Sequence, residues 1–333
     1  MKHRTLPWIF ALLLAAAISI PAWLFPARAA ATEIPLCGET VIRFATPEEG
    51  AAVLTARDAF AEQLSKFDLQ CRLQTKAPVT LDEWLQSAGR EVLAWDAAEI
   101  ERVTASVARM REGLARFRLP LPKTVLLIRT TGKEEADAAY TRANAIILPT
   151  KRLDSPPGQL DALLMHELFH VLSRHDKDTR RELYKIVGFQ VCDPIAPPPS
   201  LADRKLTNPD APAIDCYIEL TVDGKKLTAA PILYASAKEF DPQQGGNLFR
   251  YLTFRLLVIE HKDGKWQSVY HGEQPIVIDP RHLPAYFDKI GKNTNYIIHP
   301  DEILADNFGF LVRGRPDVET PRILDEMARV LAP

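Results

Sequence analysis

Apolar residues recur with a helical period in the first third of the chain. Between residues 96 and 118 they are spaced by three and four positions, the spacing of one helix face. They are Ile100, Val103, Val107, Met110, Leu114 and Phe117. Upstream, Thr80-Leu-Asp-Glu83 has the pattern of a capping box, in which a hydroxyl and a carboxylate satisfy free N–H groups at a helix start. Residues 47–118 are therefore predicted to be helical, with this apolar stripe facing the core.

Short apolar runs then predict two buried strands, Val125–Ile128 and Ala145–Leu148, the second ended by Pro149. A helix is predicted from Gln159 to about Arg174. The proline-rich segment 193–213 is expected to form an ordered loop or a flap. Within it, Asn208–Pro212 is read as a rigid turn in preference to a substrate flap.

Residues 214–280 have the texture of short β-strands. Tyr217–Val222 precedes an Asp223-Gly224 turn, and Leu252–Ile259 precedes a turn that ends at Gly264. Helices are predicted again after Pro280, at about 282–290, 300–313 and 320–331. The expected fold class is α+β, with a helical N-terminal region at 30–118, and with 214–280 as a β-rich insertion in a second region, 119–333.

The first residues resemble an export signal. Lys2, His3 and Arg4 precede an apolar stretch from Leu6 to Phe25, and the small residues Ala27 and Ala29 follow. This order is typical of a signal peptide, predicted here at residues 1–29. An uncleaved membrane anchor is the alternative, because about 20 apolar residues can span a bilayer. The mature protein is expected to be periplasmic or extracellular, with no membrane span after signal removal.

Charge and cysteine content narrow the possible partners and cofactors. The 333 residues carry a formal charge of −2 without a basic block, so nucleic acid is not an expected partner. None of the four cysteines is arranged as C-x-x-C, which disfavours a thiolate zinc site. Because export permits disulfides, the pairs Cys37–Cys71 and Cys192–Cys216 are predicted.

The pattern that carries chemistry is His166-Glu167-Leu168-Phe169-His170. On a helix, residues four apart share a face, so both imidazoles can bind one metal ion. Apolar flanking residues predict a buried helix, where two histidines and a glutamate would be costly unless they had a use. Zinc suits such a site, with Glu167 placed to act on a water molecule. The alternative is a pair of core histidines satisfied by their neighbours.

A catalytic zinc needs a third protein ligand, and two residues qualify. Asp176 follows His166 by ten residues, but that geometry needs a sharp turn, normally with glycine where Ser173 stands. Glu302 lies near the start of a predicted helix and shares a face with Asp306. Glu302 is the favoured ligand, and Asp306 is expected to accept the free N–H of a ligand histidine.

The HExxH pattern followed by Glu302-x-x-x-Asp306, within the segment HPDEILADNFGFL, resembles the gluzincin zinc metallopeptidases of the thermolysin-like clan. The resemblance implies a zincin-like core: a small β-sheet, a zinc-site helix and a helical C-terminal part. It implies one Zn²⁺ held by His166, His170 and Glu302, and a peptide or protein substrate.

The resemblance also implies roles for further residues. Glu167 would be the general base that takes the proton of the attacking water. Tyr296 and His299 are the candidates for stabilising the oxyanion. Ala143–Leu148 would be the edge strand that pairs with the substrate backbone.

A second class of function stays open at this point. The chain could be a catalytically silent zinc-binding protein that serves periplasmic binding or assembly. Retention of Glu167 argues against that interpretation, because a structural zinc needs no general base. A metal-storage protein would be expected to contain a histidine-rich tract, which this chain lacks.

Overall fold

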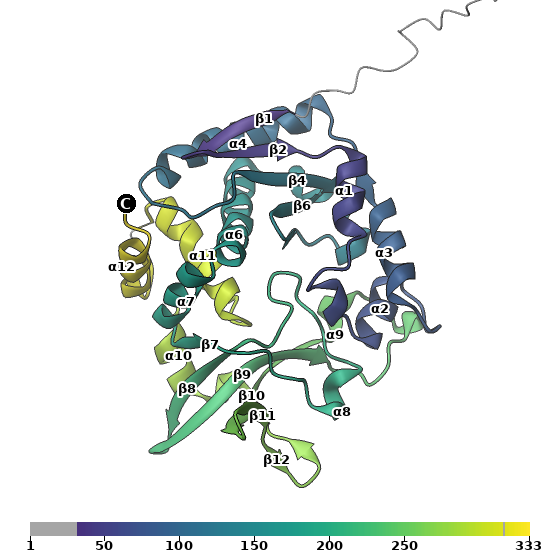
Figure 1. The fold of residues 1–333 in the computed structure, drawn as a ribbon, viewed down its shortest axis with the longest axis vertical. Coiled ribbons are helices and arrows are strands. Elements are labelled where there is room, and N and C mark those ends of the chain that lie inside the picture. Colours follow the sequence, from purple (N-terminus) through teal and green to yellow (C-terminus); the bar gives the residue numbers. More distant parts are fainter. Residues whose placement is uncertain (1–31, 316) are drawn as a thin grey trace, which may run out of the picture. The chain divides into compact units, whose positions relative to one another are not determined.

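A mixed sheet of six strands organises the N-terminal half of the described chain (Figure 1). Its order is β1-β2-β4-β6-β5, with β3 paired to the end of β4. β2, β4 and β6 are parallel, whereas β1 and β5 run antiparallel to their neighbours. The strands are β1 (Glu33–Cys37), β2 (Thr40–Phe44), β3 (Val92–Leu93), β4 (Thr124–Thr130), β5 (Tyr140–Arg142) and β6 (Ala145–Pro149).

The predicted helical N-terminal region is therefore incomplete as a description. β1 and β2 belong to the same sheet as β4, and residues 31–333 cluster as one unit. The two strands are short, and β1 is largely exposed, so a run of buried apolar residues does not mark it. The structure describes residues 32–315 and 317–333. The predicted signal peptide or anchor, residues 1–29, lies outside this range.

Helices cover both faces of this first sheet because its central strands alternate between two hydrophobic clusters. Ile146 and Leu148 of β6 face the cluster that contains α4 and α6, whereas Ala145 and Ile147 face the cluster that contains α3. This burial on both faces explains the uninterrupted apolar run of β6. The helices of this half are α1 (Pro47–Leu54), α2 (Lys66–Arg72), α3 (Leu81–Arg90), α4 (Ala97–Leu114), α5 (Thr150–Leu153), α6 (Pro157–His175) and α7 (Lys177–Ile186).

Helix starts in the N-terminal part follow the local sequence closely. Thr80 caps α3 and Asp96 caps α4, each in a capping box with a glutamate three residues later. Val103, Val107, Met110 and Leu114 of the predicted stripe are buried. The predicted core-facing helix is therefore confirmed.

The predicted β-rich segment forms a second, antiparallel sheet of order β11-β10-β9-β8-β7, with β14 paired to β10. Asp223 and Gly224 form the β8–β9 turn with positive φ values of 48° and 74°, as predicted. The strands of this sheet are β7 (Phe189–Val191), β8 (Cys216–Val222), β9 (Lys225–Ala235), β10 (Leu252–Lys262), β11 (Lys265–Ser268) and β14 (Val277–Ile278). β12 (Tyr270–His271) and β13 (Gln274–Pro275) form a separate two-stranded sheet.

The last predicted helices are also present, and one of them packs against the helix that carries HExxH. α11 (Pro300–Val312) lies along α6, and their side chains share the largest hydrophobic cluster (Figure 1). The remaining helices are α8 (Pro199–Ala202), α9 (Leu248–Tyr251), α10 (Pro284–Ile290) and α12 (Pro321–Val330). The fold class is mixed α and β, as predicted.

All four cysteines are free thiols, so the predicted disulfides are wrong. Cys37 packs against the main cluster, whereas Cys71 belongs to a different cluster with Phe240. Cys216 is paired with Val191 across β7 and β8. The next residue after Val191, Cys192, therefore faces the opposite side of the sheet. Closeness in sequence misled the pairing because strand alternation separates the two side chains.

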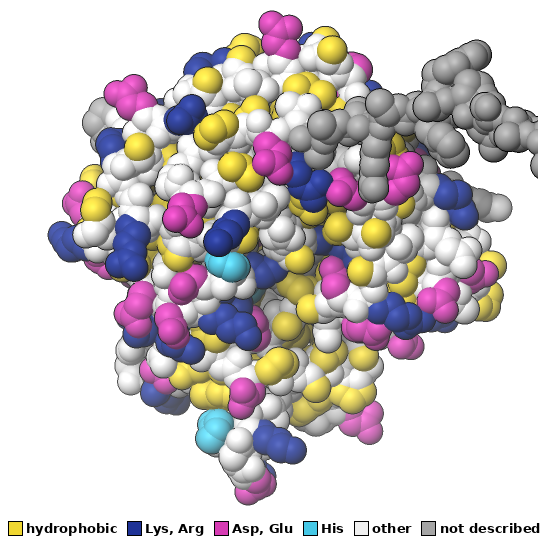
Figure 2. All heavy atoms as spheres, turned by 45° about the horizontal axis from the view of Figure 1, so that its top comes forward, with side chains coloured by type: hydrophobic (Ala, Val, Ile, Leu, Met, Phe, Trp, Pro, Cys, Tyr) yellow, Lys and Arg dark blue, Asp and Glu magenta, His cyan; other side chains and the backbone are white. Residues whose placement is uncertain are grey.

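The surface carries both charges. On the face drawn in Figure 2, lysine and arginine side chains alternate with aspartate and glutamate, with hydrophobic side chains between them. No helix among the described residues is long and apolar enough to cross a bilayer.

Candidate metal centre

α6 brings the residues of the HExxH pattern to one place. His166 and His170 are one turn apart, and their ring centroids are separated by 4.7 Å at an interplanar angle of 80°. His170 and Glu167 are buried, with 1% and 2% of their surface exposed. The helical spacing therefore places two imidazoles and one carboxylate in the interior, as predicted.

α11 carries Glu302, the predicted third ligand, to the two imidazoles. Glu302 Oε2 lies 3.1 Å from His166 Nε2 and 3.5 Å from His170 Nε2. The three ligand atoms all lie within 4.8 Å of one another. The structure thus brings together His166, His170 and Glu302, although 136 positions separate the first from the last.

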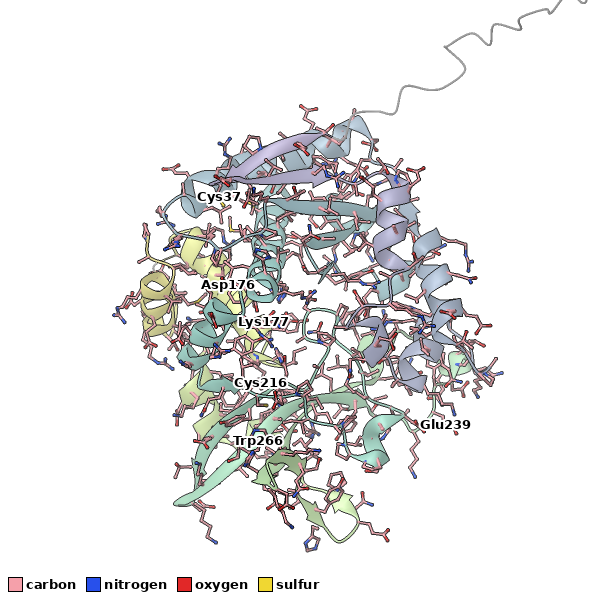
Figure 3. The ribbon with its side chains drawn as sticks, viewed as in Figure 1. Cys37, Asp176, Lys177, Cys216, Glu239 and Trp266 are labelled. Carbon is pink, nitrogen blue, oxygen red and sulfur yellow. The ribbon has the colours of Figure 1, made fainter. Side chains whose placement is uncertain are left out.

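Asp176, the alternative third ligand, has a different use. It caps the N-terminus of α7, where its Oδ1 accepts the Thr179 N–H at 2.8 Å. Figure 3 shows Asp176 beside Lys177 at the start of that helix. Hydrogen bonds from the Thr179 backbone lower the pKa of Asp176. Asp176 is not among the residues whose ligand atoms lie within 4.8 Å of one another around His166 and His170.

Two further carboxylates of α11 orient the imidazoles. Asp306 Oδ1 lies 2.9 Å from His166 Nδ1, as predicted. Asp301 Oδ2 lies 2.7 Å from His170 Nδ1, and Asp301 Oδ1 accepts hydrogen bonds from Ser173 (2.5 Å) and Tyr184 (2.9 Å). Each imidazole therefore has its Nδ1 engaged by a carboxylate, which directs Nε2 toward Glu302. Carboxylate partners of this kind fix the tautomer of metal-binding histidines.

Glu167 is held by a strand of the first sheet. Its Oε2 accepts a hydrogen bond from the Thr141 hydroxyl at 3.0 Å. Thr141 lies in β5. The strand order ends at β5, which pairs with β6 alone, whereas β6 is paired with β4 on one side and with β5 on the other. β5 is therefore the edge strand. The prediction that Ala143–Leu148 forms the edge strand is therefore wrong: β6 spans most of that range and lies inside the sheet.

Of the two residues predicted to stabilise the oxyanion, only Tyr296 lies against an imidazole of the centre. Tyr296 stacks on His166 with a centroid distance of 5.9 Å and an interplanar angle of 12°, and it is 40% exposed. Its ring thus lies against one of the two imidazoles. Burial in the hydroxyl's surroundings and the charge of Glu302 raise the pKa of Tyr296.

His299 does not face the centre, so its predicted catalytic role is not supported by its position. It is the N-cap of α11: Nδ1 accepts the Asp301 N–H at 3.2 Å, and Nε2 lies 3.4 Å from Cys216 Sγ. Burial lowers the pKa of His299 to about 4. His299, Cys216 and Asp215 form a second group of ligand types. Because Asp215 also pairs with Arg180 at 2.9 Å, this group is satisfied by protein contacts.

The proline-rich segment reaches the centre through two side chains that the sequence did not single out for chemistry. Asn208 Nδ2 donates to Glu302 Oε1 at 2.5 Å. Asp210 offers a carboxylate oxygen within 4.8 Å of ligand atoms of Glu167 and His170. In Figure 1, the chain between α8 and β8 rises from the second sheet toward β6 and α6. The rigid turn predicted at 208–212 therefore lines the centre.

The centre has more acidic than basic groups. Burial alone would raise the pKa of Glu302, but the charge of His170 and the hydrogen bond with His166 hold it well below its usual range. Burial raises the pKa of Asp210 to about 8, and the nearby carboxylates contribute. Burial likewise raises the pKa of Glu167. Three carboxylates that converge on two imidazoles create a site that stabilises added positive charge.

The donor set fits zinc. His170 Nε2 is buried and has no hydrogen-bond partner among the residues that the structure describes. Such an atom is costly to bury unless it binds something. Two imidazoles and one carboxylate are a common ligand set for catalytic zinc. A divalent cation among these atoms would satisfy His170 Nε2 and balance the carboxylates.

Several of these residues had no signal in the sequence. Acidic residues are common in a first helical turn, so the position of Asp301 in the sequence does not distinguish it from a residue without a role at the site. Thr141, Asn208 and Asp210 lie far from HExxH in sequence, and tertiary contacts alone bring them near it. Comparisons with protein-family models, with curated proteins and with solved structures find no match. A gluzincin relationship is accordingly a proposal that rests on the residues described above.

Proposed function

We propose that this protein is an exported zinc metallopeptidase of the gluzincin type, with a zincin-like core. The observation that carries the proposal is the convergence of His166 Nε2, His170 Nε2 and Glu302 Oε2 beside a buried Glu167. A structural zinc site would require protein ligands but no buried glutamate placed as a general base. The export signal predicted at residues 1–29 supports a periplasmic or extracellular location.

When bound to His166, His170 and Glu302, zinc would supply Lewis-acid activation of water and of a scissile carbonyl. Glu167 would accept the proton of the attacking water and pass it to the leaving amine. The Thr141 hydroxyl fixes the orientation of the Glu167 carboxylate, because it donates a hydrogen bond to Oε2 at 3.0 Å. Tyr296, stacked on His166 at the rim of the centre, would donate its O–H to the developing oxyanion.

Hydrogen bonds to the proposed ligands support this division of roles. Asp301 and Asp306 hold the imidazoles by Nδ1, and Asn208 holds one oxygen of Glu302. The other Glu302 oxygen faces both imidazoles. The substrate proposed is a peptide or protein, since the edge strand β5 lies directly beside Glu167.

The test is zinc content, measured by plasma mass spectrometry on the wild type, Glu302→Ala and Asp176→Ala. We expect one equivalent in the wild type, a large loss in Glu302→Ala, and full retention in Asp176→Ala. The Asp176 variant is the matched control, because it removes the rival carboxylate near the same helix. Zinc lost in Asp176→Ala and kept in Glu302→Ala would overturn the proposed ligand set. No zinc in the wild type would overturn the function.

A further inference from the structure

The loop formed by residues 208–211, named here the 208–211 loop, occupies the edge of the first sheet beside the centre. In the antiparallel β5–β6 pair, Thr141 lies opposite Ile146. The Thr141 N–H donates outward to Asp210 Oδ1 at 2.7 Å. The Thr141 carbonyl accepts a hydrogen bond from Arg174 Nη1 at 2.8 Å. Both backbone groups that β5 could offer to an added strand at this position are therefore used.

Arg174 fastens the 208–211 loop in this place. Its Nη2 donates to the carbonyls of Pro209 and Asp210 at 3.1 and 3.0 Å. One guanidinium thus joins the edge strand to the loop, and Arg174 comes from α6, the helix that carries HExxH. At the other end, Asn208 is bonded to Glu302. The loop is connected to the edge strand, to the HExxH helix and to the third ligand.

The loop also separates two hollows. One, of about 510 Å³, is bounded by Ala143, Asn144, Arg174 and Pro209. The other is bounded by Tyr140, Pro209, Asp210 and Tyr296. Pro209 belongs to the wall of both. The first hollow reaches the β5–β6 turn at Ala143 and Asn144, and the second reaches β5 at Tyr140.

Asp210 is the residue of the loop that meets the ligand atoms. One of its carboxylate oxygens lies within 4.8 Å of a ring nitrogen of His170 and of a carboxylate oxygen of Glu167. His170 belongs both to this group and to the group with His166 and Glu302. A carboxylate has a second oxygen, so the hydrogen bond from Thr141 does not prevent Asp210 from binding a cation.

We propose that Asp210 is a fourth protein ligand of the metal and that the 208–211 loop closes the substrate groove along β5. This inference rests on the proposed zinc site. A catalytic zinc keeps one position open for water. An aspartate in that position would exclude the attacking water, and the loop already occupies the backbone groups of Thr141 that a substrate strand would bind. The centre is then inactive while the loop stays in place. Substrate access then requires the loop to leave Thr141 and Arg174.

The test uses the full chain loaded with Co²⁺ or Zn²⁺, as the wild type, Asp210→Asn and Asp193→Asn. Asp193 is an exposed residue of the same proline-rich segment, and its variant is the charge-matched control. Three quantities are measured: metal stoichiometry, the visible absorption of bound Co²⁺, and the affinity for acetohydroxamate, a small chelator that needs an open metal position.

We expect one metal equivalent in all three proteins. Asp210→Asn should change the Co²⁺ spectrum and bind acetohydroxamate at least about tenfold more tightly, whereas Asp193→Asn should match the wild type. Asp210→Asn should also hydrolyse an unfolded protein such as casein faster. Equal acetohydroxamate affinity and equal spectra in the wild type and Asp210→Asn would overturn the role of Asp210, while the metal content would still support the proposed function. Absence of metal from the wild type would overturn both.

A second variant guards against misfolding of Asp210→Asn. Arg174→Lys keeps the positive charge but cannot bond Thr141, Pro209 and Asp210 together. It should increase acetohydroxamate affinity by a smaller factor with metal content unchanged. Wild-type affinity in this variant, together with wild-type affinity in Asp210→Asn, would show that the loop does not close the centre.

Discussion

Two buried clusters of charge differ in where their positive charge comes from. In the first, Arg72 binds Asp68 at 2.6 Å and Glu135 at 2.5 Å, and the side chains of Arg72 and Asp68 are 2% and 1% exposed. Thr207 completes it by donating to Asp68 and by offering its carbonyl to Arg72. In the candidate metal centre, three carboxylates meet two imidazoles, and His170 Nε2 has no hydrogen-bond partner within the described residues.

The difference teaches how a buried acidic cluster is to be interpreted. Where a guanidinium of the chain itself bonds both acids, the cluster is a structural element. Where a buried ligand atom is left without a partner, the cluster is suited to a cation from outside. The two clusters are connected in sequence, because Thr207 belongs to one, and Asn208 and Asp210 belong to the other.

The largest expected effect separates catalysis from metal binding. Glu167→Gln should reduce the hydrolysis of casein by about 10²- to 10⁴-fold, because it removes proton transfer, with zinc content unchanged. The assay is run in the wild-type and Asp210→Asn backgrounds, so that closure of the centre does not hide the loss. Full activity in Glu167→Gln would contradict its assignment as the general base.

The next prediction breaks the Arg72 cluster. Arg72→Met should lower the free energy of unfolding by about 3–5 kcal/mol, since it leaves Asp68 and Glu135 buried without a cation. Urea denaturation measures the change. The control is Arg57→Met, which removes an exposed ion pair with Asp82 and should leave stability unchanged. A similarly small effect for Arg72→Met would show that the cluster is not structural.

Zinc should sharpen the comparison. At a free concentration about 100 times the dissociation constant, zinc should raise the free energy of unfolding of the wild type by about 2.7 kcal/mol. His170→Ala should lose this increase because it removes a ligand. Arg72→Met should keep the zinc-dependent increase, despite its lower stability, because Arg72 pairs with Asp68 and Glu135 and not with the proposed zinc ligands. Equal increases in Arg72→Met and His170→Ala would place the zinc elsewhere.

The smallest effect concerns a third buried acidic position, Glu134, which forms no ion pair with the described residues. Its Oε1 accepts the Thr130 hydroxyl at 2.6 Å, and its Oε2 has no hydrogen-bond partner within the described residues. Burial raises the pKa of Glu134 to about 7 from an ordinary value of 4.5. Between these values the folded state binds a proton that the unfolded state does not, so stability falls as pH rises through this window.

Glu134→Gln should remove that slope. Relative to the wild type, it should be more stable by about 1–3 kcal/mol at pH 8 and of similar stability at pH 4. Urea denaturation at the two pH values measures this difference. Parallel pH profiles of the wild type and Glu134→Gln would show that Glu134 is ionised without cost in the folded protein.

The elements that the sequence predicts well are those with local causes. Capping boxes and a 3.6-residue period mark α3 and α4, and apolar runs mark β4 and β6. The edge strand β5 was missed because its three residues, Tyr140–Arg142, carry no alternating pattern. Its position at the sheet edge follows from pairing, which is a property of the folded chain.

The candidate site divides along the same line. Helical spacing is enough to predict that His166 and His170 share a face, and the Glu302–Asp306 pair follows from the same rule. His299 was assigned to catalysis because it lies near Glu302 in sequence, but as the N-cap it points into the second sheet toward Cys216. Asp210 lies 40 residues from His170, and no local pattern relates the two.

The separation of the ligands along the chain has a consequence for folding. Since 136 positions lie between His166 and Glu302, and the whole antiparallel sheet is formed by residues between them, α6 and α11 meet only after many distant contacts have formed. Such contacts are slow to form because of the entropy of closing long loops. A metal ion held by both helices, as proposed, would therefore not start folding. It would instead slow the opening of a chain that has already folded, and so lengthen the lifetime of the native state.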